Sequence, residues 1–210
     1  MKALSLTRPL LIVIIGLPGA GKSFFARHFS ETFGAPLVSV DQLRFELFDT
    51  PKFNQLENGL LKRLTDIQLG ELVKTRSSIL IDGMFASRPE RQELEQFATQ
   101  NDYGTLIVWV QTDEPTAKAR TLRRSPKRPG DEYNTKLTPE QFTTFAKRFM
   151  PPTKEDYVVI SGKHTYTTQA KMVLRKLSAP RVEKAEEAHH KEALHVRSTA
   201  TAGRRNVIIR

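Results

Sequence analysis

The sequence predicts an α/β fold in which a parallel β-sheet carries helices on both faces. Short runs rich in Leu, Ile and Val alternate with longer segments of helical pattern, which is typical of strands buried on both sides. A glycine-rich motif stands between the first such run and the first helical segment. The length of 210 residues suits one domain with a tail.

The strands and helices can be assigned in chain order. The uninterrupted apolar run at 10–15 predicts a buried strand, with similar runs at 78–81, 105–110 and 157–160 and a weaker one at 37–40. Helical patterns cover 22–33, 53–75, 89–100, 115–124, 139–149 and 167–177, three of them beginning at proline. Within 53–75, one side of the helix is expected to carry Leu56, Leu60, Leu64, Ile67 and Leu72.

Composition excludes several classes of site. The absence of cysteine excludes disulfides, thiolate zinc sites, iron–sulfur clusters and cysteine nucleophiles. No apolar run approaches the roughly 18 residues that span a bilayer. The run at 10–15 leads into a Gly-Lys motif rather than a cleavage site, so no signal peptide is expected. We therefore expect a cytoplasmic protein without a membrane partner. The sequence does not determine the oligomeric state, for which a monomer is the expectation.

The net charge is +10, which favours phosphate-bearing partners or a solvated surface. Residues 180–210 have seven Lys/Arg, four Glu and no aromatic residue, so +3 lies on this segment and +7 on 1–179. We expect 1–179 to form the domain and 180–210 a charged tail, partly helical or disordered. The tail histidines lack metal-ligand spacing.

The most specific motif fits G-x-x-x-x-G-K-[ST] and lies between a strand and a helix, as a phosphate-binding loop requires. It reads Gly16-Leu17-Pro18-Gly19-Ala20-Gly21-Lys22-Ser23. Glycines permit a turn whose N–H groups point at phosphate oxygens, Lys22 reaches the β- and γ-phosphates, and Ser23 is a ligand for Mg²⁺. We expect ATP and Mg²⁺ here, with contacts from Gly16 through Phe24.

Two acidic residues follow expected strands. Asp41 stands where the strand at 37–40 ends and could accept a proton from an attacking hydroxyl, or cap a helix, or do both. Arg44, one turn later, could hold an anionic group of the acceptor. Asp82 ends the strand at 78–81 and could hold Mg²⁺ or orient the acceptor, or simply be a turn residue before Gly83.

A basic, Pro/Gly-rich segment at about 123–138 is expected to form a mobile lid. Arginines there would stabilise the charge on the transferred phosphoryl group, and Arg120 and Arg124 share one helix face. Cations at a helix C-terminus also suit the helix dipole. Arg88, at the start of the helix at 89–100, is expected to contact substrate.

The order of elements resembles the small P-loop kinases of the AAA-type ATP-binding family, which includes polynucleotide 5′-hydroxyl kinase domains. Zeta-toxin-like and gluconate-kinase-like enzymes are more distant relatives. The resemblance covers residues 10–177 through GLPGAGKS, VDQLR, LIDGMFASRPERQEL, VWVQTDEPTAKARTLRR and FMPP. It implies the three-layer P-loop NTPase fold, with five parallel strands and a small lid.

The resemblance also implies roles for residues. Asp41 matches the general base, Arg44 the ligand of the acceptor phosphate, Asp82 the second acidic residue, and Arg120 or Arg124 the lid arginine. In many of these kinases Thr or Asn follows the second Asp, whereas here Gly83-Met84-Phe85 follow it, and Met84 and Phe85 could give the acceptor pocket an apolar lining.

The sequence thus predicts an ATP-dependent kinase that phosphorylates a hydroxyl of a small molecule or of a nucleic acid 5′ end. An ATPase or nucleotide-dependent switch that transfers phosphate to no separate acceptor is the alternative. A nucleic-acid-binding module with a vestigial nucleotide site is disfavoured by the intact Gly21-Lys22-Ser23.

Overall fold

The computed structural model describes residues 8–124, 132–133 and 137–178. The tail expected over 180–210 and most of the lid expected at about 123–138 lie outside these residues. The chain divides into two compact units after Leu174, and the first contains the phosphate-binding loop and the sheet. The domain boundary at 179 stays a prediction.

Five strands form one fully parallel sheet, as the sequence predicts. Their order is β2-β3-β1-β4-β5, with β1 in the centre. The strands are β1 Leu10–Ile15, β2 Leu37–Ser39, β3 Ile79–Asp82, β4 Gly104–Gln111 and β5 Tyr157–Ser161. Because all of them run the same way, their C-terminal ends form one edge, where open α/β sheets bind ligands.

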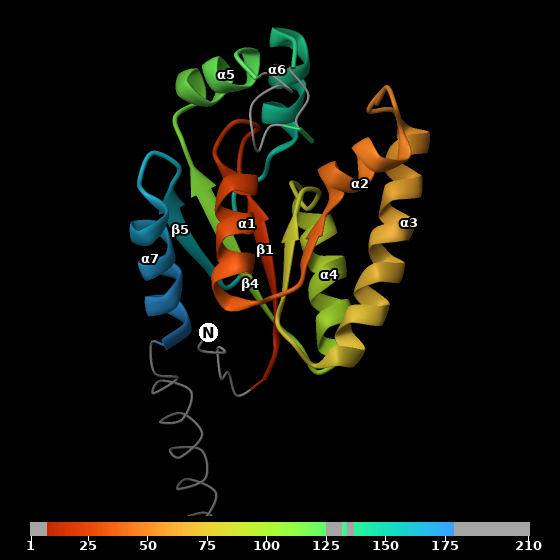
Figure 1. Cartoon of the computed structure of the whole chain (residues 1–210), viewed down its shortest axis with the longest axis vertical. Coiled ribbons are helices and arrows are strands. Elements are labelled where there is room, and N and C mark those ends of the chain that lie inside the picture. Colours follow the sequence, from red (N-terminus) through yellow and green to blue (C-terminus); the bar gives the residue numbers. More distant parts are fainter. Residues whose placement is uncertain (1–7, 125–131, 134–136, 179–210) are drawn as a thin grey trace, which may run out of the picture. The chain divides into compact units, whose positions relative to one another are not determined.

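Helices lie on both faces of this sheet (Figure 1). They are α1 Lys22–Phe33, α2 Val40–Leu47, α3 Gln55–Leu72, α4 Arg88–Gln100, α5 Glu114–Leu122, α6 Pro139–Arg148 and α7 Tyr166–Ser178, with the 3₁₀ turn η1 Val73–Thr75 after α3. The three-layer fold expected from the sequence is therefore confirmed. None of the helices within the described ranges has both the length and the apolar character needed to cross a bilayer.

The central strand β1 is buried along its whole length. Its odd-numbered side chains pack with residues of α3, η1 and α4. Since successive side chains alternate, the even-numbered ones face the other layer, where α1 lies (Figure 1). The start of α7 shares that layer, because the rings of Tyr166 and Phe25 of α1 lie 6.2 Å apart.

The side of α3 that the sequence predicts to be apolar is largely exposed, although Leu72 at its end packs against the core. Leu56 and Ile67 are 86% and 63% exposed. The buried row instead repeats every four residues and consists of Glu57, Leu61, Thr65 and Leu69. Hydrogen bonds explain this difference, because Glu57 turns inward to accept bonds from Arg44 and from two backbone N–H groups. These bonds help to fix the rotation of the helix about its axis.

Candidate active site

The phosphate-binding loop joins β1 to α1 and contains the motif predicted from the sequence. Gly16 and Gly19 have φ of 147° and 78°, and a Cβ on either would collide with a backbone carbonyl, that of Val110 or Ala117 respectively. The close approach to β4 and α5 therefore requires glycine. Gly21 caps α1 without any side chain to occupy the first N–H groups of the helix, which leaves them suited to an anion.

The Lys22 side chain folds back over this loop. Its Nζ donates to the carbonyl oxygens of Gly16 at 3.1 Å and Leu17 at 3.0 Å. Burial lowers the pKa of Lys22, while the carboxylates of Asp82 and Asp41 oppose that shift. A polyphosphate beside the ammonium would favour its charged form in the same way.

Asp82 lies beside the loop because β3 is the neighbour of β1, with Asp82 in register with Ile14. The side chain is buried, and burial raises its pKa against the opposing effects of Lys22 and the Ser23 hydroxyl. Its Oδ1 has no hydrogen-bond partner within the described part of the chain. A buried carboxylate oxygen without a partner, next to a serine hydroxyl, fits hydrated Mg²⁺.

The described residues contain no group of three or more His, Asp or Glu side chains that could hold a metal ion. Mg²⁺ in nucleotide sites is held by one or two protein oxygens together with phosphates and water. The loop and β3 bring the Ser23 hydroxyl and the Asp82 carboxylate together, and their part in holding Mg²⁺ stays a prediction.

Asp41 lies in the first turn of α2 and is half-buried. The N-cap is not Asp41 but Ser39, whose Oγ accepts from the Gln42 N–H at 3.4 Å. The Asp41 side chain thus has no capping bond to make at this helix. It lines the same cavity as Lys22 and lies near enough to favour the charged form of Lys22.

Arg44 also lines this cavity, but its guanidinium is held inside the protein. It forms a buried ion pair with Glu57 at 2.9 Å and donates to Asn58 Oδ1 at 2.7 Å. Its Cζ lies 4.5 Å from the centroid of the Phe53 ring. The part of Arg44 in binding an acceptor phosphate stays a prediction, because these internal partners already engage the two terminal nitrogens.

The arginines predicted to serve the site fall into two groups. Arg120 and Arg124 line the cavity, and Arg120 donates to the carbonyl of Gly162 at 3.0 Å. Arg88 is exposed at the start of α4 and is not among the lining residues, although Ser87 and Glu90 are. The structure thus brings Arg120 and Arg124, but not Arg88, to the loop.

The backbone after Asp82 is unusual. Gly83, Met84 and Phe85 all have positive φ, of 95°, 56° and 57°. Buried Arg91 holds this segment by donating to the carbonyls of Phe85 and Ala86, and it pairs with Glu155 at 2.8 Å. Met84 lines the cavity, whereas Phe85 packs into the core, so only the first of the two residues lines the pocket.

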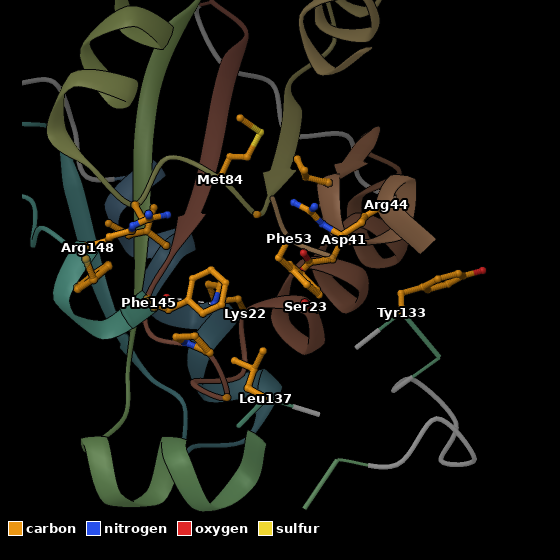
Figure 2. Close-up of a pocket in the computed structure, with 18 of the residues that line it drawn as sticks. Lys22, Ser23, Asp41, Arg44, Phe53, Met84, Tyr133, Leu137, Phe145 and Arg148 are labelled. Atoms are coloured by element: carbon orange, nitrogen blue, oxygen red, sulfur yellow. Dashed lines mark hydrogen bonds between the residues drawn. The ribbon is translucent and has the colours of Figure 1, made fainter. Parts of the chain in front are cut away.

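The cavity has a volume of about 1200 Å³, which exceeds the usual range for one ligand and leaves room for a nucleotide and an acceptor. Figure 2 shows Lys22, Ser23 and Asp41 together with Phe53, Met84 and Phe145 around it. Sequence patterns missed its aromatic and basic lining from α2, α6 and the segment before α3: Phe45, Phe53, Phe145, Lys147, Arg148 and Phe149. The only available signal was the strong amphipathic pattern of 139–149.

Comparisons with known proteins agree with this geometry. The sequence matches the model of an AAA domain family over residues 11–152. No curated protein matches it at a significant level.

Several solved kinase structures have a similar fold. An APS kinase from Mycobacterium tuberculosis is 17% identical, with a TM-score of 0.59 over 81% of this chain and 98% of that one. A gluconokinase from Sinorhizobium meliloti is 19% identical, with a TM-score of 0.56 over 90% and 98%.

Kti12 from Chaetomium thermophilum is 16% identical, with a TM-score of 0.60 over 80% of this chain and 99% of that one. At these identities the likeness shows the shared fold, and the family match shows the relationship. With its complete phosphate-binding loop, the chain belongs to the AAA domain family of P-loop proteins.

Proposed function

We propose that this protein is a kinase that transfers the γ-phosphoryl group of ATP to a hydroxyl of a second substrate. One observation carries the proposal: Asp41, with no helix end to cap, lines the same cavity as Lys22 of the phosphate-binding loop. A carboxylate facing the phosphate site can accept the proton of an acceptor hydroxyl as that hydroxyl attacks the γ-phosphorus.

The loop residues would hold the nucleotide. The N–H groups at the start of α1 and the Lys22 ammonium would bind the phosphates, while Ser23 and Asp82 would hold Mg²⁺, which neutralises phosphate charge when bound. Eight of the described lining residues are Lys or Arg and two are acidic. This excess of positive charge suits a polyphosphate.

Asp41 would take the proton of the acceptor hydroxyl. As the acceptor oxygen forms its bond to the γ-phosphorus, the bond from that phosphorus to the β–γ bridging oxygen breaks, ADP leaves, and the proton goes to the Asp41 carboxylate. Arg120 and Arg124 would stabilise the charge on the transferred group. The family supports nucleotide binding, and two of the structural neighbours were solved with nucleotides, AMPPNP in the APS kinase and ADP-AlF₃ in Kti12.

The acceptor class can be tested with ATP labelled at the γ-phosphate and a pool of hydroxyl compounds that includes sugars, nucleosides and oligonucleotides with 5′-hydroxyl ends. We expect label to enter one member of the pool in wild type and none in Lys22→Met. Label found in no acceptor, with ATP still hydrolysed, would replace the kinase with the ATPase alternative.

Salt dependence separates the two acceptor classes. Each phosphate that Lys or Arg neutralises releases counterions, so binding of a single strand should fall with salt with a log–log slope near −0.7 per contact. A small uncharged acceptor should bind almost equally well at all salt concentrations. A flat profile together with no oligonucleotide phosphorylation would eliminate the nucleic acid acceptor.

A further inference from the structure

The part of the cavity outside the phosphate-binding loop and α5 contains a cluster of apolar side chains, together with polar ones that include Ser87, Glu90, Lys147 and Arg148. The residues of the apolar cluster come from α2, the segment before α3, the segment after β3, and α6 with the residue before its cap: Val40, Phe45, Phe53, Met84, Leu137 and Phe145. A polyhydroxylated sugar needs donors and acceptors around its ring, because unpaired hydroxyls lose their bonds to water. The side chains of the apolar cluster offer none.

Three polar side chains within this region, those of Arg44, Glu57 and Asn58, are engaged with one another. Arg44 donates to Glu57 and to Asn58, and Glu57 also accepts the N–H groups of Lys52 and Phe53, both at 2.7 Å. An acceptor that replaced Glu57 or Asn58 as the partner of Arg44 would have to break these buried bonds, at a cost that an apolar molecule avoids, although Arg44 Nε has no hydrogen-bond partner among the described residues. Of the two described carboxylates that line the cavity, Glu90 accepts the Ser87 N–H at 2.9 Å, and Asp41 is the one that we propose for the hydroxyl.

Two aromatic rings meet across the cavity from distant parts of the chain. Phe53 precedes α3 and Phe145 lies on α6, and their ring centroids are 6.4 Å apart at an interplanar angle of 83°. The Arg44 guanidinium lies over the Phe53 ring, and the Phe53 N–H donates to Glu57. The backbone of Phe53 has a positive φ of 55°. Figure 2 shows both rings among the residues that surround Lys22 and Ser23.

Positive φ is rare for a bulky residue and persists where surrounding bonds impose it. The Arg44–Glu57 pair therefore joins α2 to α3 and also positions the Phe53 ring, because Arg44 contacts the ring and Glu57 accepts the Phe53 N–H. Aromatic faces and edges presented in this way bind flat rings, which gain from stacked or edge-to-face contact.

From this lining we infer that the acceptor is a small hydroxyl compound with an aromatic ring, whose ring packs against Phe53 and Phe145 while its hydroxyl reaches Asp41. The inference rests on the proposed kinase function for the use of the hydroxyl, but the ring site itself does not depend on it. Arg44 is, on this account, a positioning residue for Phe53.

The test combines binding and transfer. Thymidine and 2-phenylethanol serve as ring-bearing probes, gluconate and glycerol as ring-free ones, and a 5′-hydroxyl oligonucleotide as the large acceptor. Binding is measured by saturation-transfer NMR with saturating AMPPNP, so that no probe enters the nucleotide site. Transfer is measured with γ-labelled ATP.

The variants are Phe145→Leu, Phe145→Tyr as the ring-preserving change, and Phe33→Leu as the matched control. Phe33 packs against Phe29 of α1 and does not line the cavity. We expect ring-bearing probes to bind, with a loss of about five- to tenfold in Phe145→Leu and little change in the other two.

The outcomes separate the two proposals. Binding of ring-bearing probes that depends on Phe145, without transfer, would support the ring site and count against the kinase. Transfer to gluconate or glycerol alone would support the kinase and overturn the ring site. Phosphorylation of the oligonucleotide but of no free nucleoside or alcohol, binding of no ring-bearing probe, or equal binding in Phe145→Leu would overturn it as well.

Discussion

The two sides of the cavity are built in different ways. The phosphate side consists of backbone: glycines at positive φ, the uncapped start of α1, and one lysine that bonds to loop carbonyls. The acceptor side consists of side chains from four separate segments, held by the buried Arg44–Glu57 pair and the Phe53–Phe145 contact. In the proposed kinase, the first would recognise a chemical group common to all nucleotides, whereas the second could change its substrate through changes of side chain.

The largest expected effect separates chemistry from binding. Asp41→Asn should lower the transfer rate about 10²- to 10⁴-fold while ATP affinity is retained, because an amide cannot take the hydroxyl proton. Asp49→Asn is the control, since Asp49 is exposed and does not line the cavity. Steady-state kinetics measure the transfer rate, and calorimetry measures ATP affinity. Unchanged turnover in Asp41→Asn would show that Asp41 is not the general base.

The phosphate side can be disabled at one residue. Lys22→Met keeps the aliphatic stem and removes the charge, so ATP binding should weaken about 10- to 100-fold, as expected for a lost bond to a charged group. The melting temperature of the free protein should stay near that of wild type, because burial already opposes the Lys22 charge. Equal ATP affinity in calorimetry, beside a Lys74→Met control, would contradict this assignment.

On the acceptor side, by contrast, a substitution in the buried ion pair should lower the free energy of unfolding. Arg44→Met leaves Glu57 without its buried partner, and we expect a loss of about 3 kcal/mol in the free energy of unfolding by urea. Lys62→Met, which removes an exposed ion pair with Asp66, should cost less than about 1 kcal/mol. Similar losses in the two variants would mean that Arg44 is not a structural anchor.

The smallest effect concerns pH. Burial acts to raise the pKa of Glu57, but the N–H groups of Lys52 and Phe53 and the Arg44 guanidinium outweigh it, so the pKa lies below its ordinary value of 4.5. A carboxyl with a lowered pKa contributes stability above that ordinary value and loses it as the pH falls through the folded-state pKa. Glu57→Gln should therefore melt lower than wild type at neutral pH, with the gap closing below about pH 4.5. A gap that stays constant down to pH 2 would argue against an ionised Glu57.

The difference between the two sides also explains what the sequence could predict. The phosphate side is local, since one motif between a strand and a helix determines it, and the expected helix at 22–33 matches α1. The acceptor side depends on which face of α3 turns inward and on Phe145 meeting Phe53 from 92 positions away in the chain. Apolar periodicity predicted that Leu56 and Ile67 lie on the apolar side of the helix, but both are exposed. The pattern contains no information about the backbone N–H groups that bond to Glu57 and allow it to be buried.

The fate of the γ-phosphate tests the central claim most directly. Wild type is supplied with γ-labelled ATP and the acceptor found in the pooled screen, and the label is divided between phosphorylated acceptor and free phosphate. The kinase account predicts that most label enters the acceptor, and that Asp41→Asn abolishes this product while ATP still binds. Label released only as free phosphate, at a rate that no acceptor changes, would contradict it.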